Sequence, residues 1–351
     1  MESILIFLFS LGILIFFHEL GHFLIAKKLK VPVEEFAIGF PPSLLRKKIG
    51  ETIYSFNLIF LGGYVRLRGE NNLNDPDGFL NKPAWIKIAI VLGGVFFNLI
   101  LAYFLISFGY LIGLPEYSPQ SQNVVILRIM PQGIAEKASL RMLDRLVYLK
   151  FDKDMIYFTD PTKVREIFEN YRGKEVILGI ERAKKMIEIK VTPEINKNLS
   201  PLGVYLGSLD LIKYKFPSNF YFGLIKTKDL FVNMIIGMKD FFIKLFEGKK
   251  EVLSEVVGPL GMFDIYNQFR LLGFNYLIYF LAIVSVNLVI LNLLPIPALD
   301  GGRFIFYLYE LLSGKKLPLR IENLVNTIGF IFLLILMILI TIKDLSYKFF
   351  K

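Results

Sequence analysis

Cysteine is absent from the 351 residues, and histidine occurs only twice. Without cysteine the chain can form neither a disulfide bond nor a thiolate metal site. Charged residues are also scarce, at 21% of the sequence, whereas 54% of the residues are hydrophobic. This balance is too apolar for an ordinary soluble globule and predicts a polytopic α-helical membrane protein.

Acidic residues are outnumbered by basic ones, which gives a formal net charge of +10. Such a charge can indicate nucleic-acid binding. In a membrane protein the commoner cause is basic residues in cytoplasmic loops and near lipid headgroups. We therefore expect contact with membrane lipid and no nucleic-acid partner.

Both histidines fall in one short motif, His18-Glu19-Leu20-Gly21-His22, inside an apolar run. Residues four apart share a helix face, so the two imidazoles can bind one metal ion while Glu19 lies beside them to transfer protons. This spacing is typical of catalytic zinc sites. A histidine pair that only packs in a core is the alternative reading.

Catalytic zinc usually takes three protein ligands and leaves one position for water. Since no cysteine or third histidine exists, the third ligand must be Asp or Glu. Asp300 is a carboxylate that follows an apolar run, just after two prolines that would break a helix and just before Gly301-Gly302. The sequence predicts one zinc ion held by His18, His22 and Asp300, with a simple helix-ending turn as the alternative.

Four apolar stretches are long enough to cross a bilayer as helices. Gly93, Gly94 and Asn98 lie inside the second of them and predict close packing of that face against the active-site helices. The predicted segments are 1–26 (first transmembrane helix with the zinc motif), 27–84 (cytoplasmic loop and β-hairpin), 85–114 (second transmembrane helix), 115–211 (soluble domain), 212–272 (amphipathic surface helix region), 273–302 (third transmembrane segment with Asp300), 303–322 (cytoplasmic loop) and 323–351 (fourth transmembrane helix and tail).

The basic residues concentrate in the two loops 27–84 and 303–322. The positive-inside rule places these loops in the cytoplasm, so the soluble domain and both termini are expected outside, with the active site toward the cytoplasmic side. Within the soluble domain, a helix is predicted over 161–171 with Thr159 or Asp160 as its cap. An amphipathic helix over 220–246 is expected on the membrane surface, or else packed on the soluble domain.

Two further features suggest substrate binding. A β-hairpin over 51–68, with its turn at Gly62-Gly63, could offer an edge to an extended substrate, although a hairpin that plugs the bundle is equally consistent. Asn287 and Asn292 lie five apart in the third span and could hold a substrate carbonyl or an oxyanion. Interhelical hydrogen bonding is the alternative for both amides.

The histidine motif in a first membrane helix, together with residues 292–302 in a later one, resembles the site-2 protease family of intramembrane zinc metalloproteases, specifically the bacterial regulators of sigma-E proteolysis. The resemblance covers nearly the whole chain. It implies cleavage of peptide bonds in or near transmembrane segments at the bacterial inner membrane, on substrates such as anti-sigma factors or signal-peptide remnants already cut by another protease. Glu19 would be the catalytic base.

The soluble stretch is similar to the PDZ domain of that family through residues 131–140 and Asp144, which implies one inserted PDZ-like α/β domain. Ser139 and Leu143 stand where the family has glycine, a departure that bears on peptide binding, and Arg303 stands where histidine is common. The resemblance therefore favours a domain that filters substrates by size over one that reads a trimmed end.

Two other classes of protein remain as alternatives. A zinc-carrying membrane transporter would also bury His and Asp ligands, but it would be expected to show inverted repeats, which the sequence lacks. A catalytically inactive PDZ membrane scaffold would not need the intact Glu19.

Overall fold

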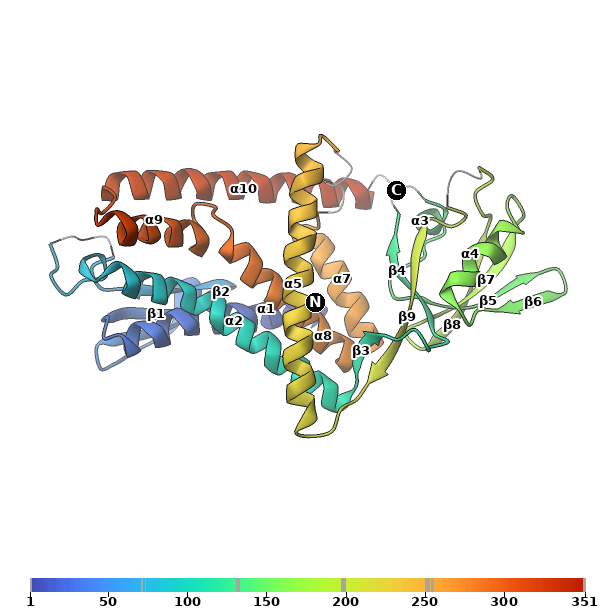
Figure 1. Cartoon of the computed structure of the whole chain (residues 1–351), viewed down its shortest axis with the longest axis horizontal. Coiled ribbons are helices and arrows are strands. Elements are labelled where there is room, and N and C mark those ends of the chain that lie inside the picture. Colours follow the sequence, from blue (N-terminus) through green and yellow to red (C-terminus); the bar gives the residue numbers. More distant parts are fainter. Residues whose placement is uncertain are drawn as a thin grey trace. The chain divides into compact units, whose positions relative to one another are not determined.

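The structure is a computed structural model that describes residues 2–70, 72, 74–130, 133–196, 200–249, 253 and 256–349. It forms two compact units, each made of segments distant in sequence (Figure 1). The first unit comprises Met1–Ser107, Phe220–Tyr266 and Phe280–Lys351, and the second comprises Phe108–Asn219 and Asn267–Tyr279.

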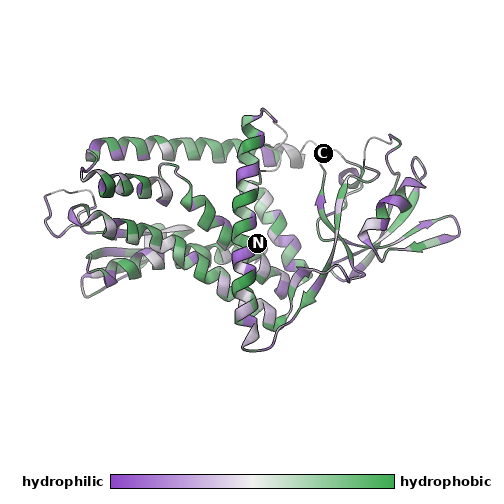
Figure 2. Ribbon diagram, in the orientation of Figure 1, coloured by the Kyte–Doolittle hydropathy of each residue, from purple (hydrophilic) through white to green (hydrophobic). Residues whose placement is uncertain are grey.

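Four of the described helices are long and apolar enough to cross a membrane. They are α1 (Glu2–Lys28), α2 (Ala84–Ile112), α8 (Phe274–Leu293) and α10 (Leu319–Phe349), and they cover the four apolar stretches predicted from the sequence. Figure 2 shows hydrophobic residues along most of their length. The chain is therefore a membrane protein with an inserted β-rich domain.

Helices α1 and α2 approach each other through glycine. A Cβ atom on Gly21 would lie 2.2 Å from the carbonyl oxygen of Gly93, so no side chain fits at this crossing. The close packing predicted from the glycine pair in α2 is confirmed. Because Gly21 lies inside the histidine motif, the contact holds that motif directly against α2.

Helix α8 ends at Leu293, and α9 (Asp300–Ser313) begins at Asp300, so the six residues 294–299 lie between the two helices. The two prolines fall in the intervening turn and exclude a continuous helix, as predicted. A Cβ atom on Gly301 would lie 2.1 Å from the Leu294 carbonyl oxygen, so this tight turn requires glycine. Asp300 thereby becomes the first residue of α9, a helix that lies in the stretch predicted only as a loop.

The turn before α9 is also fixed by α10. The Ala298 backbone N–H donates to Asn326 Oδ1 at 3.2 Å, and a Cβ atom on Gly329 would lie 2.5 Å from Pro297. The described part of α10 is otherwise mostly exposed, which suits a helix that faces lipid.

A small sheet formed by β1 (Val33–Ile49) and β2 (Thr52–Leu67) lies beside α1. Residues 35–38 stand opposite both 53–56 and 63–66, so the segment 63–67 forms an outer row of the sheet. No strand among the described residues pairs with the free edge of this row. The single hairpin predicted over 51–68 was wrong: the tight turn is at Gly50, and Gly62-Gly63 lie within β2, because the pairing also recruits residues 33–49.

One apolar core joins these elements. Its buried side chains come from α1, both strands, the short helix η1 (Phe79–Asn81), α2 and α9. The remaining helices of the first unit are α5 (Ser218–Phe246) and most of α7 (Pro259–Leu272). The apolar face of α5 packs on α2 and α8 through Leu230, Phe231, Met234 and Met238, so this predicted amphipathic helix contacts the helical unit.

The second unit is built on a seven-stranded sheet with the order β3-β9-β4-β5-β7-β8, and β6 pairs with β5. Its strands are β3 (Leu114–Tyr117), β4 (Val124–Ile129), β5 (Arg145–Phe151), β6 (Asp154–Tyr157), β7 (Val176–Arg182), β8 (Lys185–Val191) and β9 (Val204–Ile212). Two short helices accompany them, α3 (Ile134–Lys137) and α4 (Pro161–Glu169).

The predicted helix after Asp160 is confirmed. Asp160 accepts a hydrogen bond from the Thr162 backbone N–H at 2.8 Å and caps α4. The hydrogen bonds from Thr162 hold the pKa of the Asp160 carboxyl below its usual range. Of the sequence similar to a PDZ domain, Pro131 and Gln132 lie outside the described residues.

Ser139 and Leu143, which stand where the PDZ resemblance leads one to expect glycine, both have positive φ angles. Their φ angles are 59° and 68°, in the left-handed region that disfavours residues with a Cβ atom. Ser139 is exposed, so its side chain gains little packing in return. The turn between α3 and β5 is therefore strained at two positions.

Replacing Ser139 with glycine should stabilise the second unit by about 1 kcal/mol, because the left-handed conformation is free of steric cost for glycine. Hydrogen exchange of the full-length chain in detergent measures this as roughly fivefold slower exchange of the strand amides of this unit. Ser139→Ala is the matched control, since it removes the hydroxyl but keeps Cβ and should bring no gain. Equal effects of the two substitutions would contradict the strain argument.

Candidate metal centre

Three predicted ligands meet inside the first unit. Asp300 Oδ2 lies 3.2 Å from His18 Nε2 and 3.4 Å from His22 Nε2, and the two Nε2 atoms are 3.2 Å apart. The histidines share a face of α1, as the four-residue spacing predicts, and the turn before α9 carries Asp300 to them. The structure thus brings together side chains from opposite ends of the sequence.

These three atoms have the spacing of metal ligands. Four ligands at about 2.0–2.1 Å around a tetrahedral zinc ion stand roughly 3.3–3.4 Å from one another. Asp300 Oδ2 is buried and has no hydrogen-bond donor of good geometry; it faces only the two imidazole nitrogens. A cation among the three electron-rich atoms would satisfy them all, so the donor set fits zinc.

The other ring nitrogen of each histidine also has a partner. His22 Nδ1 lies 2.8 Å from the Ile90 carbonyl oxygen, which can only accept, so Nδ1 carries the proton and Nε2 presents a lone pair. His18 Nδ1 lies 3.4 Å from the side-chain amide nitrogen of Asn98. The backbone carbonyl oxygen of Asn98 accepts a 2.8 Å hydrogen bond from Ser285 Oγ. Both imidazoles are oriented from behind by α2.

The side-chain oxygen of Asn98 is buried without a hydrogen-bond partner. The amide nitrogen and oxygen of asparagine are assigned from the surrounding network. Exchanging them would let Oδ1 accept from His18 Nδ1–H and direct His18 Nε2 to the metal, as for His22. Asn98 is a polar residue inside an apolar helix, and His18 is therefore its polar partner.

Gly94 makes room for the imidazoles. A Cβ atom there would lie 2.4 Å from His22 Nε2 and 2.7 Å from His18 Cε1. The glycine pair of α2 thus has two separate tasks, since Gly93 meets the backbone of α1 and Gly94 meets the ligand rings.

The site opens into a cavity of about 520 Å³. Glu19 lines it beside the histidines, and so do residues 63–67 of the outer row of the sheet. Of the residues predicted to bind substrate, Gly63 and Asn292 line this cavity. Gly62 packs against the Phe40 ring instead, and Asn287 is not among the lining residues.

Glu70 and Arg303 also line the cavity and form an ion pair of 3.0 Å. Neither was singled out as a site residue from the sequence. Their signal was weak, because a lone acid after a strand and a lone base after two glycines are ordinary features of cytoplasmic loops. Only the fold places them together beside the metal ligands.

Comparison with known proteins adds to this geometry. A model of peptidase family M50 matches residues 6–336. The chain belongs to peptidase family M50. Among relatives of this M50 peptidase, a protein of Clostridium perfringens named as a zinc metalloprotease is 33% identical over 344 residues, which are 97% of each chain. A Fusobacterium nucleatum protein of the same description is 34% identical over 348 residues, 97% of this chain and 98% of that protein.

A third relative is the regulator of sigma-W protease RasP of Bacillus subtilis, which is 29% identical over 433 residues, 99% of each chain. The resemblance to the site-2 protease family stated from the two metal motifs is confirmed. With its apolar helices, the M50 peptidase is an intramembrane zinc metalloprotease. The transporter and scaffold alternatives receive no support from these relatives.

Proposed function

We propose that this protease cleaves membrane proteins within or beside a transmembrane segment, using one zinc ion held by His18, His22 and Asp300. The observation that carries the proposal is the convergence of two Nε2 atoms and one buried carboxylate oxygen, 3.2–3.4 Å apart, in a cavity that also contains Glu19. Two imidazoles and a carboxylate leave the fourth position of a tetrahedral ion for water.

Zinc, when bound, lowers the pKa of a water molecule and polarises a carbonyl group. Glu19 takes the proton of the attacking water at its carboxylate and returns it to the nitrogen of the leaving amine, so the carboxylate ends the cycle unprotonated. Asn292 lines the same cavity, where its amide can donate to the scissile carbonyl oxygen.

Glu19→Gln and Asp300→Asn separate the chemical role from the ligand role. Glu19→Gln should retain one zinc per chain and lose at least about a thousandfold in cleavage rate, because it removes the base and leaves the ligands. Asp300→Asn should lose zinc, since a neutral amide is a poor zinc ligand. Zinc content is measured by elemental analysis, and cleavage by hydrolysis of a membrane peptide by the full chain in detergent.

Gly12→Ala provides a control in α1, because a Cβ atom there would have no neighbour within 4 Å. It should change neither zinc content nor rate. Full cleavage by Glu19→Gln would remove Glu19 as the base, and unchanged zinc in Asp300→Asn would assign the third ligand to another carboxylate.

The substrate segment is proposed to add to the outer row of the small sheet. Residues 63–66 present a strand edge along the cavity that pairs with no other described strand, and a Cβ atom on Gly63 would lie 3.0 Å from Glu19 Cγ, so this edge runs directly past the proposed base. A helical substrate hides its peptide groups in its own hydrogen bonds, whereas an extended one exposes them and can pair with the edge. Unwinding before cleavage is therefore part of the proposal.

Site-directed cross-linking can reveal the conformation of the bound substrate, because the chain has no cysteine of its own. With Arg66→Cys in the outer row and Glu19→Gln to trap the complex, single cysteines along the substrate should cross-link at every second position. Lys47→Cys on the exposed outer hairpin is the control and should give no such ladder. A period of three to four residues would instead show that the substrate stays helical.

The proposed membrane orientation rests on the basic residues of two loops, and the proposed substrate class rests on the name of a relative. Basic loops on either side of the site favour a cytoplasmic active site in the bacterial inner membrane, with the inserted domain and both termini outside. The name regulator of sigma-W protease, carried by RasP, supports anti-sigma-factor substrates; signal-peptide remnants fit the same cleavage. A prior cut by another protease would trim the extracytoplasmic part.

The inserted domain is proposed to be a PDZ-like filter. Its seven-stranded sheet and α4 enclose a groove of about 520 Å³ between α4 and β9, lined by Val164, Phe168 and Leu206 among others. This groove is apolar enough to accept a peptide, so the domain still has a surface that could bind the trimmed end of a substrate. The strained turn at Ser139 and Leu143 is the departure that favours the filter.

A filter predicts that cleavage depends on the bulk of the substrate and on the side that carries it. A folded domain fused to the extracytoplasmic end of the substrate should reduce cleavage at least tenfold, and the same domain fused to the cytoplasmic end should not. Changes to the terminal residues of a trimmed substrate should have little effect. Strong dependence on those residues at constant size would establish a reader, and inhibition by the cytoplasmic fusion would reverse the orientation.

A further inference from the structure

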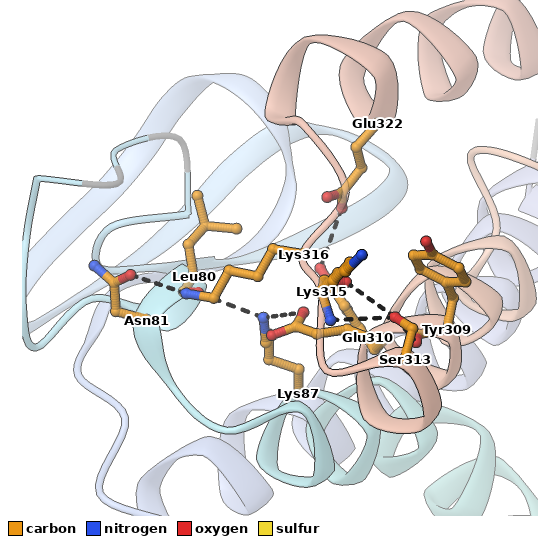
Figure 3. Close-up of polar contacts among 10 residues, drawn as sticks. Leu80, Asn81, Lys87, Tyr309, Glu310, Ser313, Lys315, Lys316 and Glu322 are labelled. Carbon is orange, nitrogen blue, oxygen red and sulfur yellow. Dashed lines mark hydrogen bonds and ion pairs between the residues drawn. The ribbon is translucent and has the colours of Figure 1, made fainter.

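Helix α9 carries the proposed ligand Asp300 at its first residue and is held at its other end by a separate set of contacts. Lys87 Nζ lies 2.5 Å from Glu310 Oε2, and Lys316 Nζ donates to the Leu80 carbonyl oxygen at 2.9 Å and to Asn81 Oδ1 at 3.1 Å. Figure 3 shows these side chains joining the start of α2 and the segment before it to the last turns of α9 and the loop beyond. None of them lines the metal cavity.

At the end of α9 near the metal, one carboxylate touches two functional elements. Glu70 Oε1 pairs with Arg303 Nη1 at 3.0 Å, and Glu70 Oε2 accepts a hydrogen bond from the Leu67 backbone N–H at 3.4 Å. Arg303 lies three residues after Asp300, on the same face of α9. Leu67 is the last residue of β2, the strand whose outer row borders the cavity.

We propose that Glu70 is a positioning residue for peptide hydrolysis, which with Arg303 sets the distance between the substrate-binding edge of β2 and the helix that carries Asp300. The inference rests on the proposed three-ligand site and strand-edge substrate. Glu70 touches neither a proposed ligand nor the reacting atoms. Its effect is on where the scissile carbonyl lies relative to the metal.

The Glu70–Arg303 pair connects the sheet to α9, which the other ion pairs nearby do not do. Lys87–Glu310 fixes α9 to α2 without contacting the sheet, and Arg68–Asp75 closes the loop after β2 without contacting α9. Only Glu70, among the charged residues of the described cavity lining, bonds both the end of β2 and α9. A displacement of about 1 Å between a bound substrate and a catalytic group can cost a hundredfold in rate, so this connection has kinetic weight.

Breaking the pair should leave the fold intact. The side chains of Glu70 and Arg303 are 22% and 42% exposed, so water can solvate the remaining partner and no isolated charge is buried. This separates the pair from Lys87, whose side chain is 1% exposed and would be costly to leave alone.

The test compares Glu70→Gln, Arg303→Gln and the double variant that carries both substitutions. Each single variant should lower kcat about tenfold to a hundredfold with smaller change in KM and one zinc per chain retained, because the substrate binds but is misplaced. The double variant should lose no more than the larger of the two single losses, because both substitutions break the same ion pair. Arg303→Lys keeps the charge and should remain within about fivefold of the unsubstituted chain.

Arg68→Gln is the matched control, since it removes an ion pair with an acid of the same loop. The Arg68 guanidinium holds the pKa of the Asp75 carboxyl below its usual range but makes no contact with α9, so kcat should stay within twofold. All variants are measured as full chains in detergent with a membrane peptide, by cleavage kinetics and elemental zinc analysis.

Wild-type kcat in Glu70→Gln would overturn the proposal, and so would a double variant whose loss is the product of the two single losses. Loss of zinc in Glu70→Gln would also overturn it, because Glu70 would then be needed for metal binding and not for the placement of the substrate. Failure of the proposed function itself looks different: the unsubstituted chain would then lack zinc or fail to cleave the peptide.

Discussion

The arrangement on which the helical unit depends is the meeting of three electron-rich atoms in a space with few compensating donors. Two imidazole nitrogens and a carboxylate oxygen at 3.2–3.4 Å are unfavourable together unless a cation lies among them. Around this point the chain uses residues that are otherwise costly in membrane helices, namely Asn98 and the ligands themselves. Binding of a divalent cation would offset those costs and make the metal part of the stability of the unit.

Glycine and proline residues determine how His18, His22 and Asp300 come together. Gly21 and Gly93 bring α1 against α2, Gly94 leaves space for the rings, and Gly301 permits the turn that begins α9. The prolines before Asp300 prevent α8 from continuing past His18 and His22. At Gly21, Gly93 and Gly301 the missing side chain allows backbone to approach within a distance that any other residue would block. The site is thus specified as much by absent side chains as by present ones.

The sequence alone predicted the features that depend on rare residue types, such as ionisable side chains inside apolar runs. His18, His22 and Asp300 were identifiable because ionisable groups in apolar runs are few, and the helix positions followed from apolar length. The small sheet was predicted incompletely, because residues 33–49 pair with two separated parts of β2 and such a register leaves no regular alternation in the sequence. Asn287 and Gly62 do not line the cavity, because spacing along the chain does not determine which face of an element borders it. Glu70 and Arg303 become notable only when two distant loops are brought together.

The polar contacts beside the metal have a physical logic that follows from the location of the site. A protease that acts at membrane depth must expose peptide groups of an apolar segment, and each such group costs several kcal/mol when left without a partner in hydrocarbon. The edge of residues 63–66 can supply those partners, and the paired charges of Glu70 and Arg303 line the same cavity without adding net charge. Water needed for hydrolysis and a strand edge needed for the substrate are then available at one place. In the proposed mechanism both stand at fixed distances from the same ion, and Glu70 with Arg303 connects the end of β2 to α9 beside it.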